Sequence, residues 1–346
     1  MKKGCLKLLL FLLYLPAVAQ IGGTATYRFL SLTPSALQNA LGGKQFVSMP
    51  YDLLQNFSNP ALISPGQTEM LGLNYANHIT DINYGNAGYV FKIPKAGYIF
   101  TGITYLNYGR FTAANADGEI TGKFTASESA LNIGYAYRIA SGFSVGANIK
   151  WIHSALAEYR SDGLAFDIGL HYQNNFSEWA LVFRNFGFQL STYNGTREPL
   201  PFEIDLGFAQ LLAHAPLRLY VTFENLQKPA IAFVNTAHNR TDPSGNEIPE
   251  NINLIHHFFR HLIVGAELFP RKRFNIRLGF NFRRSAELGL QNVNFSSGFT
   301  AGFGLRLRRF RLNYAYAQYH FAGNSNMLGL TVFLNPSKYE KNQHSH

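Results

Sequence analysis

Apolar and polar residues alternate with a period of two through most of this 346-residue chain. Over residues 143–151 every odd position is apolar, while Ser144, Asn148 and Lys150 lie on the other face. Residues 164–172 repeat the pattern. A helix would scatter these residues around its whole circumference. The alternation therefore predicts β-strands with one apolar and one polar face.

About fourteen such segments follow one another, which predicts an all-β fold. Their approximate spans are 68–78, 82–93, 96–109, 123–139, 143–156, 163–173, 178–187, 201–213, 217–227, 258–269, 272–284, 297–308, 309–321 and 325–335. Short and long connections alternate for most of the chain, as in outer-membrane barrels. An even number of strands places both ends of such a barrel on the short-turn, periplasmic side.

The composition selects a transmembrane barrel over a soluble sheet. Charged residues make up 14% of the chain, against about 25% in soluble domains. No stretch after residue 20 reaches the roughly 18 apolar residues of a membrane-spanning helix. The mean hydropathy of −0.07 fits strands whose lipid-facing and lumen-facing residues alternate. We expect an outer-membrane β-barrel of about 14 antiparallel strands with a short N-terminal hatch or plug.

The first nineteen residues have the features of a secretory signal peptide. Three lysines precede an apolar run over residues 8–18, and Ala17-Val18-Ala19 supplies a cleavage site. Removing residues 1–19 discards those lysines, so the formal charge falls from +10 to 10 − 3 = +7. Cys5 is removed as well, which excludes disulfides, thiol catalysis and cysteine-ligated metals from the mature chain.

The remaining chain divides into three parts. Residues 20–67 lack alternation and hold glycines, prolines and apolar clusters, which predicts a hatch-like segment. Residues 68–335 form the barrel, and residues 336–346 form a polar periplasmic tail. The basic residues do not gather into a patch away from the strands, so nucleic acid is not an expected partner.

The N-terminal segment carries motifs of known outer-membrane proteins. Asn59-Pro60-Ala61 is similar to the NPA element of FadL-type barrels, in which an N-terminal hatch occupies a fourteen-stranded barrel. A second set of residues resembles the PorV/PorQ family of the Bacteroidetes type IX secretion system, and its PorQ-like members more closely. That set consists of Gly22, Gly23, Tyr27, Phe29, Leu30, Pro34, Ser35, Gly42 and Gly43.

This resemblance implies a role without chemistry or cofactor. PorQ-like proteins are expected to hold a PorZ-like surface protein in an attachment complex with PorU- and PorV-like components, which anchors secreted cargo to lipopolysaccharide. Such contacts would use extracellular loops. The longest predicted loop, residues 227–257, is the candidate partner site, with Phe233, Val234, Arg240 and Asp242 as its candidate residues.

Charged residues are also expected on the lumen side of the strands. The carboxylates are Glu128, Asp167, Glu203, Asp205, Glu224 and Glu267, and the arginines are Arg138, Arg184, Arg218, Arg277, Arg283 and Arg306. We interpret them as ion pairs that brace the wall and any inserted plug. Inward glycines, among them Gly146, Gly169 and Gly279, would let a plug backbone approach the wall closely.

Catalytic and metal sites are disfavoured. His256, His257 and His261 are expected to flank the start of a strand without a carboxylate triad, so no metal is assigned. The Gly-x-Ser-x-Gly match at Gly142 to Gly146 lies at the start of a predicted strand. A nucleophile elbow requires a turn from a strand into a helix, so no serine-esterase site is assigned. Three hypotheses remain: a hatch-plugged barrel that tethers a surface partner, a FadL-like channel for hydrophobic small molecules, and a barrel enzyme whose Ser, His and Asp come from separate strands.

Overall fold

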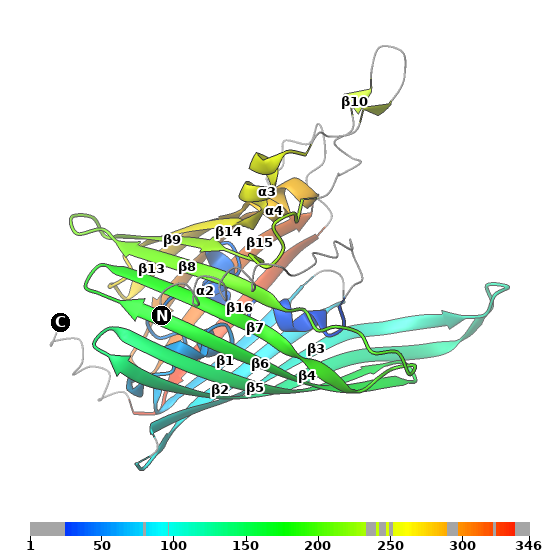
Figure 1. Cartoon of the computed structure of the whole chain (residues 1–346), viewed down its shortest axis with the longest axis horizontal. Coiled ribbons are helices and arrows are strands. Elements are labelled where there is room, and N and C mark those ends of the chain that lie inside the picture. Colours follow the sequence, from blue (N-terminus) through cyan, green and yellow to red (C-terminus); the bar gives the residue numbers. More distant parts are fainter. Residues whose placement is uncertain are drawn as a thin grey trace, which may run out of the picture.

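Fourteen antiparallel strands close into one barrel in the computed structural model, which describes residues 25–78, 81–95, 97–232, 240–241, 247–248, 252–288, 297–320 and 323–335. Each strand pairs with its sequence neighbours in the barrel, and β1 pairs with β16 to close it (Figure 1). The predicted all-β, fourteen-stranded antiparallel barrel is confirmed. The strands are β1 (Met70–Asn77), β2 (Asn83–Ile93), β3 (Gly97–Ala114), β4 (Ile120–Ala140), β5 (Phe143–Leu156), β6 (Tyr159–Gln173), β7 (Ser177–Ser191), β8 (Glu203–Leu211), β9 (Leu217–Phe223), β12 (Leu262–Leu268), β13 (Phe274–Asn281), β14 (Phe299–Arg306), β15 (Phe310–His320) and β16 (Gly323–Phe333).

The alternation in the sequence sets which face of each strand points outward. On β5, Ile149 and Trp151 are exposed on the outside, while Asn148 and Lys150 are buried on the inside. Trp151 lies opposite Leu131 of β4, which is also exposed. Paired apolar side chains of this kind make the outer surface of the barrel apolar, whereas its inner surface carries the buried polar and charged side chains together with apolar ones.

Strand boundaries differ from the sequence prediction at several places. Residues 258–261, predicted as strand, belong to helix α3 (Leu254–His261), and residues 282–284 belong to α4 (Phe282–Leu288). Aromatic residues made both stretches resemble strand ends. Conversely, the loop predicted over 110–123 is largely strand. Residues 108–125 of β3 and β4 form a two-stranded ribbon that projects beyond the pairing with β2 and β5 (Figure 1).

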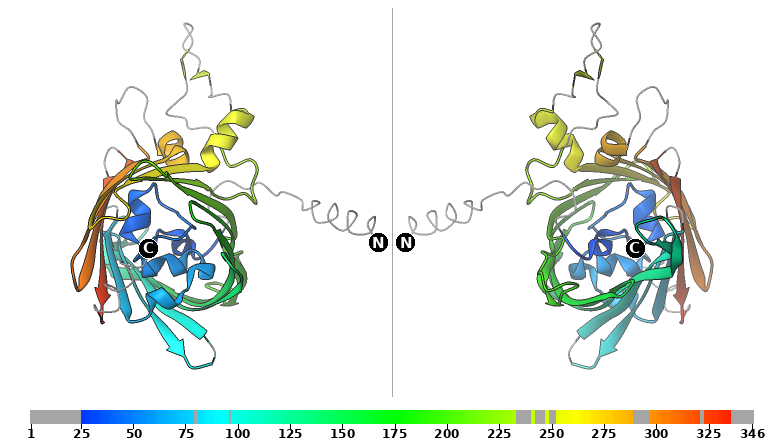
Figure 2. Two further views of the ribbon diagram at one scale, coloured as in Figure 1. Left: turned by 90° about the vertical axis from the view of Figure 1, so that its left-hand side faces the viewer. Right: turned by 90° about the vertical axis from the view of Figure 1, so that its right-hand side faces the viewer.

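The N-terminal residues 25–69 lie inside the ring of strands, as the two end-on views show (Figure 2). We call them the lumenal segment. Its elements are η1 (Arg28–Ser31), α2 (Ala36–Ala40), η2 (Leu53–Phe57), η3 (Pro60–Leu62) and η4 (Pro65–Gln67). No helix within the described part of the chain is long and apolar enough to span a membrane.

Glycines on the inner wall allow the lumenal segment to touch the strands. A Cβ atom built on Gly146 of β5 would overlap the backbone of Pro60, and one on Gly169 of β6 would overlap the side chain of Asn59. A Cβ on Gly279 of β13 would overlap the backbone at Gly42. The inward glycines therefore serve close backbone approach, as the sequence predicts.

Gly146→Ala should force the lumenal segment away from β5. Overpacking of a filled interior costs about 1–3 kcal/mol, so we expect a decrease of that size in the free energy of unfolding, measured by urea titration of the barrel in lipid vesicles. Gly122→Ala is the matched control, because a Cβ there meets no atom within 4 Å. Equal stability of the two variants would contradict the close contact.

Candidate functional site

The lumenal segment and the charged residues that hold it form the candidate site. Helix α2 is the first fixed element. The Ser35 Oγ accepts the N–H of Gln38 at the helix start, and it donates to the Asp52 carboxylate at 2.5 Å. Gly42 and Gly43 follow the helix with φ of 100° and 121°, a region that favours glycine. This turn brings Lys44 to the wall.

Lys44 enters a group of buried charges that we call the anchor cluster. The cluster consists of Lys44, Arg184, Glu203, Asp205, Glu224 and Arg283. The Lys44 Nζ lies 2.8 Å from Glu203 and 3.4 Å from Glu224. Arg184 of β7 lies 3.2 Å from Glu203 and also donates to the carbonyl of Leu30 at 3.1 Å. The cluster therefore joins two points of the lumenal segment to β7 and β8.

Burial and ion pairing act in opposite directions on these groups. Burial alone would lower the pKa of the Lys44 ammonium, but Glu203 and Glu224 outweigh it and hold the pKa above its ordinary value of 10.5. Burial alone would raise the pKa of Glu224, but Arg283 and Lys44 outweigh it and hold that pKa below 4.5. Both groups are thus charged at neutral pH.

Further polar contacts fasten the segment elsewhere on the wall. Glu178 of β7 accepts the N–H of Ser48 at 2.9 Å and pairs with Arg218 of β9 at 2.9 Å. Arg311 of β15 donates to the carbonyl of Pro50 at 2.9 Å. Wall side chains thereby bind backbone groups of the segment that no helix or sheet satisfies.

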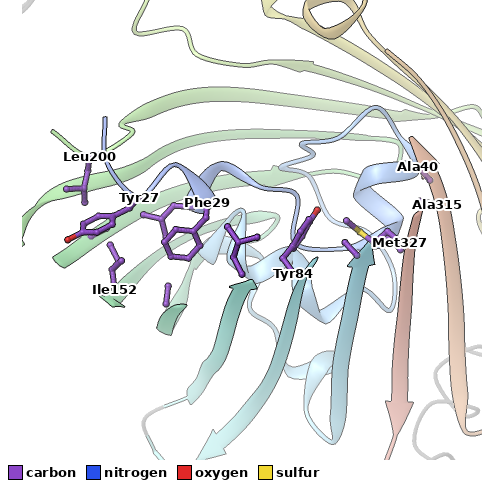
Figure 3. Packing of buried hydrophobic residues seen from close by; sticks show 14 residues of the cluster. Tyr27, Phe29, Ala40, Tyr84, Ile152, Leu200, Ala315 and Met327 are labelled. Atoms are coloured by element: carbon purple, nitrogen blue, oxygen red, sulfur yellow. The ribbon is translucent and has the colours of Figure 1, made fainter. Parts of the chain in front are cut away.

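Apolar contacts fill the spaces between these polar ties. One cluster extends from Tyr27 and Phe29 of the segment to Ile152 of β5 and Met327 of β16 (Figure 3). A second joins Leu37, Leu41, Phe46, Val47 and Met49 to Ala180, Val182, Ala209 and Tyr220 of the wall. A third joins Leu53, Leu54, Phe57 and Ile63 to Val90 and Phe100. The interface between segment and wall is therefore an apolar seam interrupted by charges.

Two hollows border this seam. The inner one measures about 30 Å³ and is lined by Phe29, Leu30, Phe57, Lys150 and Arg184, among others. The outer one measures about 470 Å³ and opens on the short-turn side, between the Ala61–Pro65 stretch and β3–β6. A typical small-molecule site occupies roughly 300–1,000 Å³. Of these two hollows, only the outer one is therefore large enough for a small-molecule ligand while the segment is in place.

The Asn59-Pro60-Ala61 motif lies against β5 and β6. The Asn59 Oδ1 accepts the N–H of Ala61 at 2.9 Å, and its Nδ2 donates to the carbonyl of Phe46 at 2.8 Å. Pro60 occupies the first position of η3. Asparagine and proline are thus the residues that start this turn and tie it to the rest of the segment.

The other N-terminal motif residues are spread along the segment. Tyr27, Phe29 and Leu30 are buried near β5, and the Tyr27 hydroxyl hydrogen-bonds Ser161. Pro34 and Ser35 begin α2, and Gly42 and Gly43 end it. Gly22 and Gly23 lie outside the described residues.

The candidate partner loop is described only in part. Arg240 lies in the two-residue strand β10 (Arg240–Thr241), where it pairs with Ile248 of β11 (Glu247–Ile248). Phe233, Val234 and Asp242 lie outside the described residues.

The three histidines lie on α3, whose last residue, His261, directly precedes β12. Because aromatic residues are frequent in strands, the sequence did not indicate this helix. Across the described ranges, no group of three or more His, Cys, Asp or Glu side chains could hold a metal ion.

Most of the inward charges lie where the sequence places them. All six carboxylates are buried, as are Arg184, Arg218 and Arg277. Arg138 is instead exposed at the end of β4, and Arg283 lies on α4, where its guanidinium is 3.5 Å from Glu224. Arg306 lies over the Tyr51 ring at 5.0 Å. Lys44 and Glu178 are further site residues that no local sequence pattern marks, since Lys44 meets a residue 159 positions away.

Lys44→Met should loosen the lumenal segment. Removing one partner of a buried ion pair leaves its counter-charges uncompensated, so we expect a loss of about 3 kcal/mol in unfolding free energy, measured by urea titration in vesicles. Lys123→Met is the matched control, since Lys123 is exposed on the projecting ribbon.

The stability difference between wild type and Lys44→Met should depend on pH. Because the pKa of Glu224 is lowered in the folded state, this group stabilises the fold at pH values above 4.5. This contribution is lost as the pH falls through the folded-state pKa. Because the pKa of Lys44 is raised in the folded state, this group stabilises the fold at pH values below 10.5. This contribution is lost as the pH rises through the folded-state pKa. The difference between the two proteins should thus be largest between these two pH values. A difference that stays equally large at pH 1, where the carboxylates are protonated, would contradict the ionic anchor.

No protein-family profile matches the chain, and no curated protein matches it. Several solved structures do. The Ralstonia pickettii toluene transporter TbuX is 12% identical, over 88% of this chain and 98% of its own, with a TM-score of 0.51. The Pseudomonas putida toluene transporter TodX is 13% identical, over 87% and 97%, with a TM-score of 0.52. A Pseudomonas aeruginosa FadL homologue is 11% identical, over 88% and 99%, also at 0.52. The chain therefore has the FadL-like barrel fold.

Proposed function

We propose that this chain is a non-enzymatic barrel of the outer membrane, with its short turns and both barrel ends on the periplasmic side. Its apolar outer surface and polar inner surface support this location. Trp151 and Trp179 are exposed on that outer surface, and tyrosines gather at the short-turn ends of the strands, where Tyr135 and Tyr137 of β4 are exposed. Aromatic side chains at strand ends suit the membrane–water interface.

Within this location, we propose passage of hydrophobic small molecules along the seam between the lumenal segment and the wall. The observation that carries this proposal is that the wall closes without the segment, through the pairing of β1 with β16. Apart from its peptide bond to β1, the segment is held by non-covalent contacts, so a shift of the segment need not open the barrel. The toluene transporters that share the fold support the same class of cargo.

A disulfide lock tests this function. A Cβ built on Gly329 of β16 lies 3.3 Å from the Cβ of Ala36, close to the separation of about 3.5–4.5 Å that a disulfide requires. In a Cys5→Ser background, Ala36→Cys with Gly329→Cys should abolish uptake of labelled toluene and of a labelled fatty acid when oxidised. Reduction should restore uptake.

The single variants Ala36→Cys and Gly329→Cys are the matched controls, and neither should respond to oxidant. Uptake by wild-type cells that does not exceed uptake by cells lacking the protein would overturn the channel function. Unchanged uptake in the oxidised double variant would show that passage does not require movement of the segment.

A second function, tethering of a surface protein, is favoured by a different observation. The lumenal segment occupies the lumen and leaves an inner hollow of only about 30 Å³, while the ribbon of residues 108–125 projects from the long-connection side (Figure 1). The PorV/PorQ resemblance of the N-terminal motifs adds a proposed setting, the type IX secretion system. There the chain would hold a PorZ-like partner beside PorU- and PorV-like components and support anchoring of cargo to lipopolysaccharide.

Affinity capture from detergent extracts tests the tether. A tagged wild-type chain should recover a surface protein, and removal of residues 229–255 should abolish that recovery and release cargo from the cell surface. The disulfide-locked chain should still recover the partner, because a tether needs no movement in the lumen. Failure to recover a surface protein, with cargo still anchored after the deletion, would overturn this function.

A further inference from the structure

Helix α3 (Leu254–His261) has its apolar side outward and its polar side toward the protein. Leu254 and Ile255 are 85% and 64% exposed, and Phe258 and Phe259 are 53% and 42% exposed. These residues share one side of the helix, because Leu254 and Phe258 are four positions apart, as are Ile255 and Phe259. Arg260 and His261, in contrast, are buried. A helix on a water-exposed surface has the opposite arrangement.

Polar contacts fix this orientation. The His261 Nδ1–H donates to the carbonyl of Glu224 at 2.6 Å, and the Glu224 N–H donates to the carbonyl of His261 at 2.9 Å. The His257 Nδ1 accepts the N–H of Ala232 at 3.0 Å. At the helix start, the Asn253 Oδ1 accepts the N–H groups of Ile255 and His256. The apolar side is therefore held outward by the folded structure.

The outward side of α3 continues the apolar outer surface of the barrel. The Phe258 ring lies 5.7 Å from that of Phe223, at the end of β9. The Phe259 ring lies 5.3 Å from Phe282 of α4, which in turn lies 4.9 Å from Phe280 of β13. Phe223 and Phe280 lie on the outer faces of their strands, because successive strand residues point to opposite faces. Their neighbours in the chain, Thr222 and Asn281, are buried on the inner face. One aromatic surface thus extends from the strands onto the helix.

The position of α3 also points to lipid. In both end-on views α3 and α4 lie outside the ring of strands, beside the wall (Figure 2). A helix there meets the lipid that surrounds the barrel. Four large apolar side chains exposed to water would be unfavourable, whereas the boundary between headgroups and acyl chains accommodates an apolar helix face to a depth of roughly 5–10 Å.

We propose that α3 is an interfacial helix whose apolar face inserts among the acyl chains of the leaflet on the long-connection side. The helix would fix the height and tilt of the barrel there and hold Asn253, where the preceding loop ends, at the membrane surface. This proposal rests on the proposed outer-membrane location. A second copy of the chain, or another protein, is the competing occupant of the same face.

Tryptophan quenching in vesicles tests the proposal with the full chain. Trp151 and Trp179 are the only two tryptophans, so Trp151→Phe with Trp179→Phe gives a dark background. Phe258→Trp in that background reports on α3, and Phe124→Trp reports on the projecting ribbon as a matched control. Each protein is measured in vesicles of phosphatidylcholine with brominated acyl chains and in the presence of iodide.

The expected result is that brominated lipid quenches Phe258→Trp at least as strongly as it quenches the native tryptophans. Phe124→Trp should be quenched by iodide and not by lipid. If lipid quenches the native tryptophans but iodide alone quenches Phe258→Trp, α3 lies in water and the proposal is overturned. Shielding from both quenchers would show a protein occupant and would also overturn it. Native tryptophans that lipid does not quench would overturn the outer-membrane location itself.

Discussion

The width of a fourteen-stranded barrel is the constraint on which the rest of this structure depends. Side chains can fill a barrel of about eight strands, whereas a substantially wider one needs either water or inserted chain. Here the lumenal segment fills the space, and its irregular backbone requires partners for its N–H and C=O groups. The wall supplies them, because Glu178, Arg184 and Arg311 reach inward to backbone groups of the segment. Glycines then let Pro60 and Gly42 approach the strands.

The sequence reveals those features that depend on local period. Strand identity, the apolar outer surface and the inward file of glycines all follow from alternation with a period of two, because a strand places successive residues on opposite faces. Glu203 and Arg184 could be assigned to the lumen for the same reason. The contact between these two residues could not be predicted, because it depends on the register between β7 and β8. In that register Arg184 lies opposite Glu203.

Features that depend on contacts between distant residues are not readable in this way. Lys44 lies in a segment without periodicity, and its distance from Glu203 is a property of the closed barrel. Residues 258–261 were predicted as strand because phenylalanines are frequent in strands, yet the Asn253 cap starts a helix. The outward apolar side of α3 adds to the difficulty, because the usual rule that apolar residues face the protein is inverted there.

Both proposed functions start from a segment that is packed inside the lumen in the resting protein. Hydrogen–deuterium exchange of the chain in lipid vesicles tests this most directly. Amides of residues 36–63 should exchange as slowly as those of the central strands, because they are buried and bonded within the lumen, while residues 115–119 at the ribbon tip should exchange fast. Exchange of residues 36–63 at the rate of the ribbon tip would contradict a packed lumenal segment.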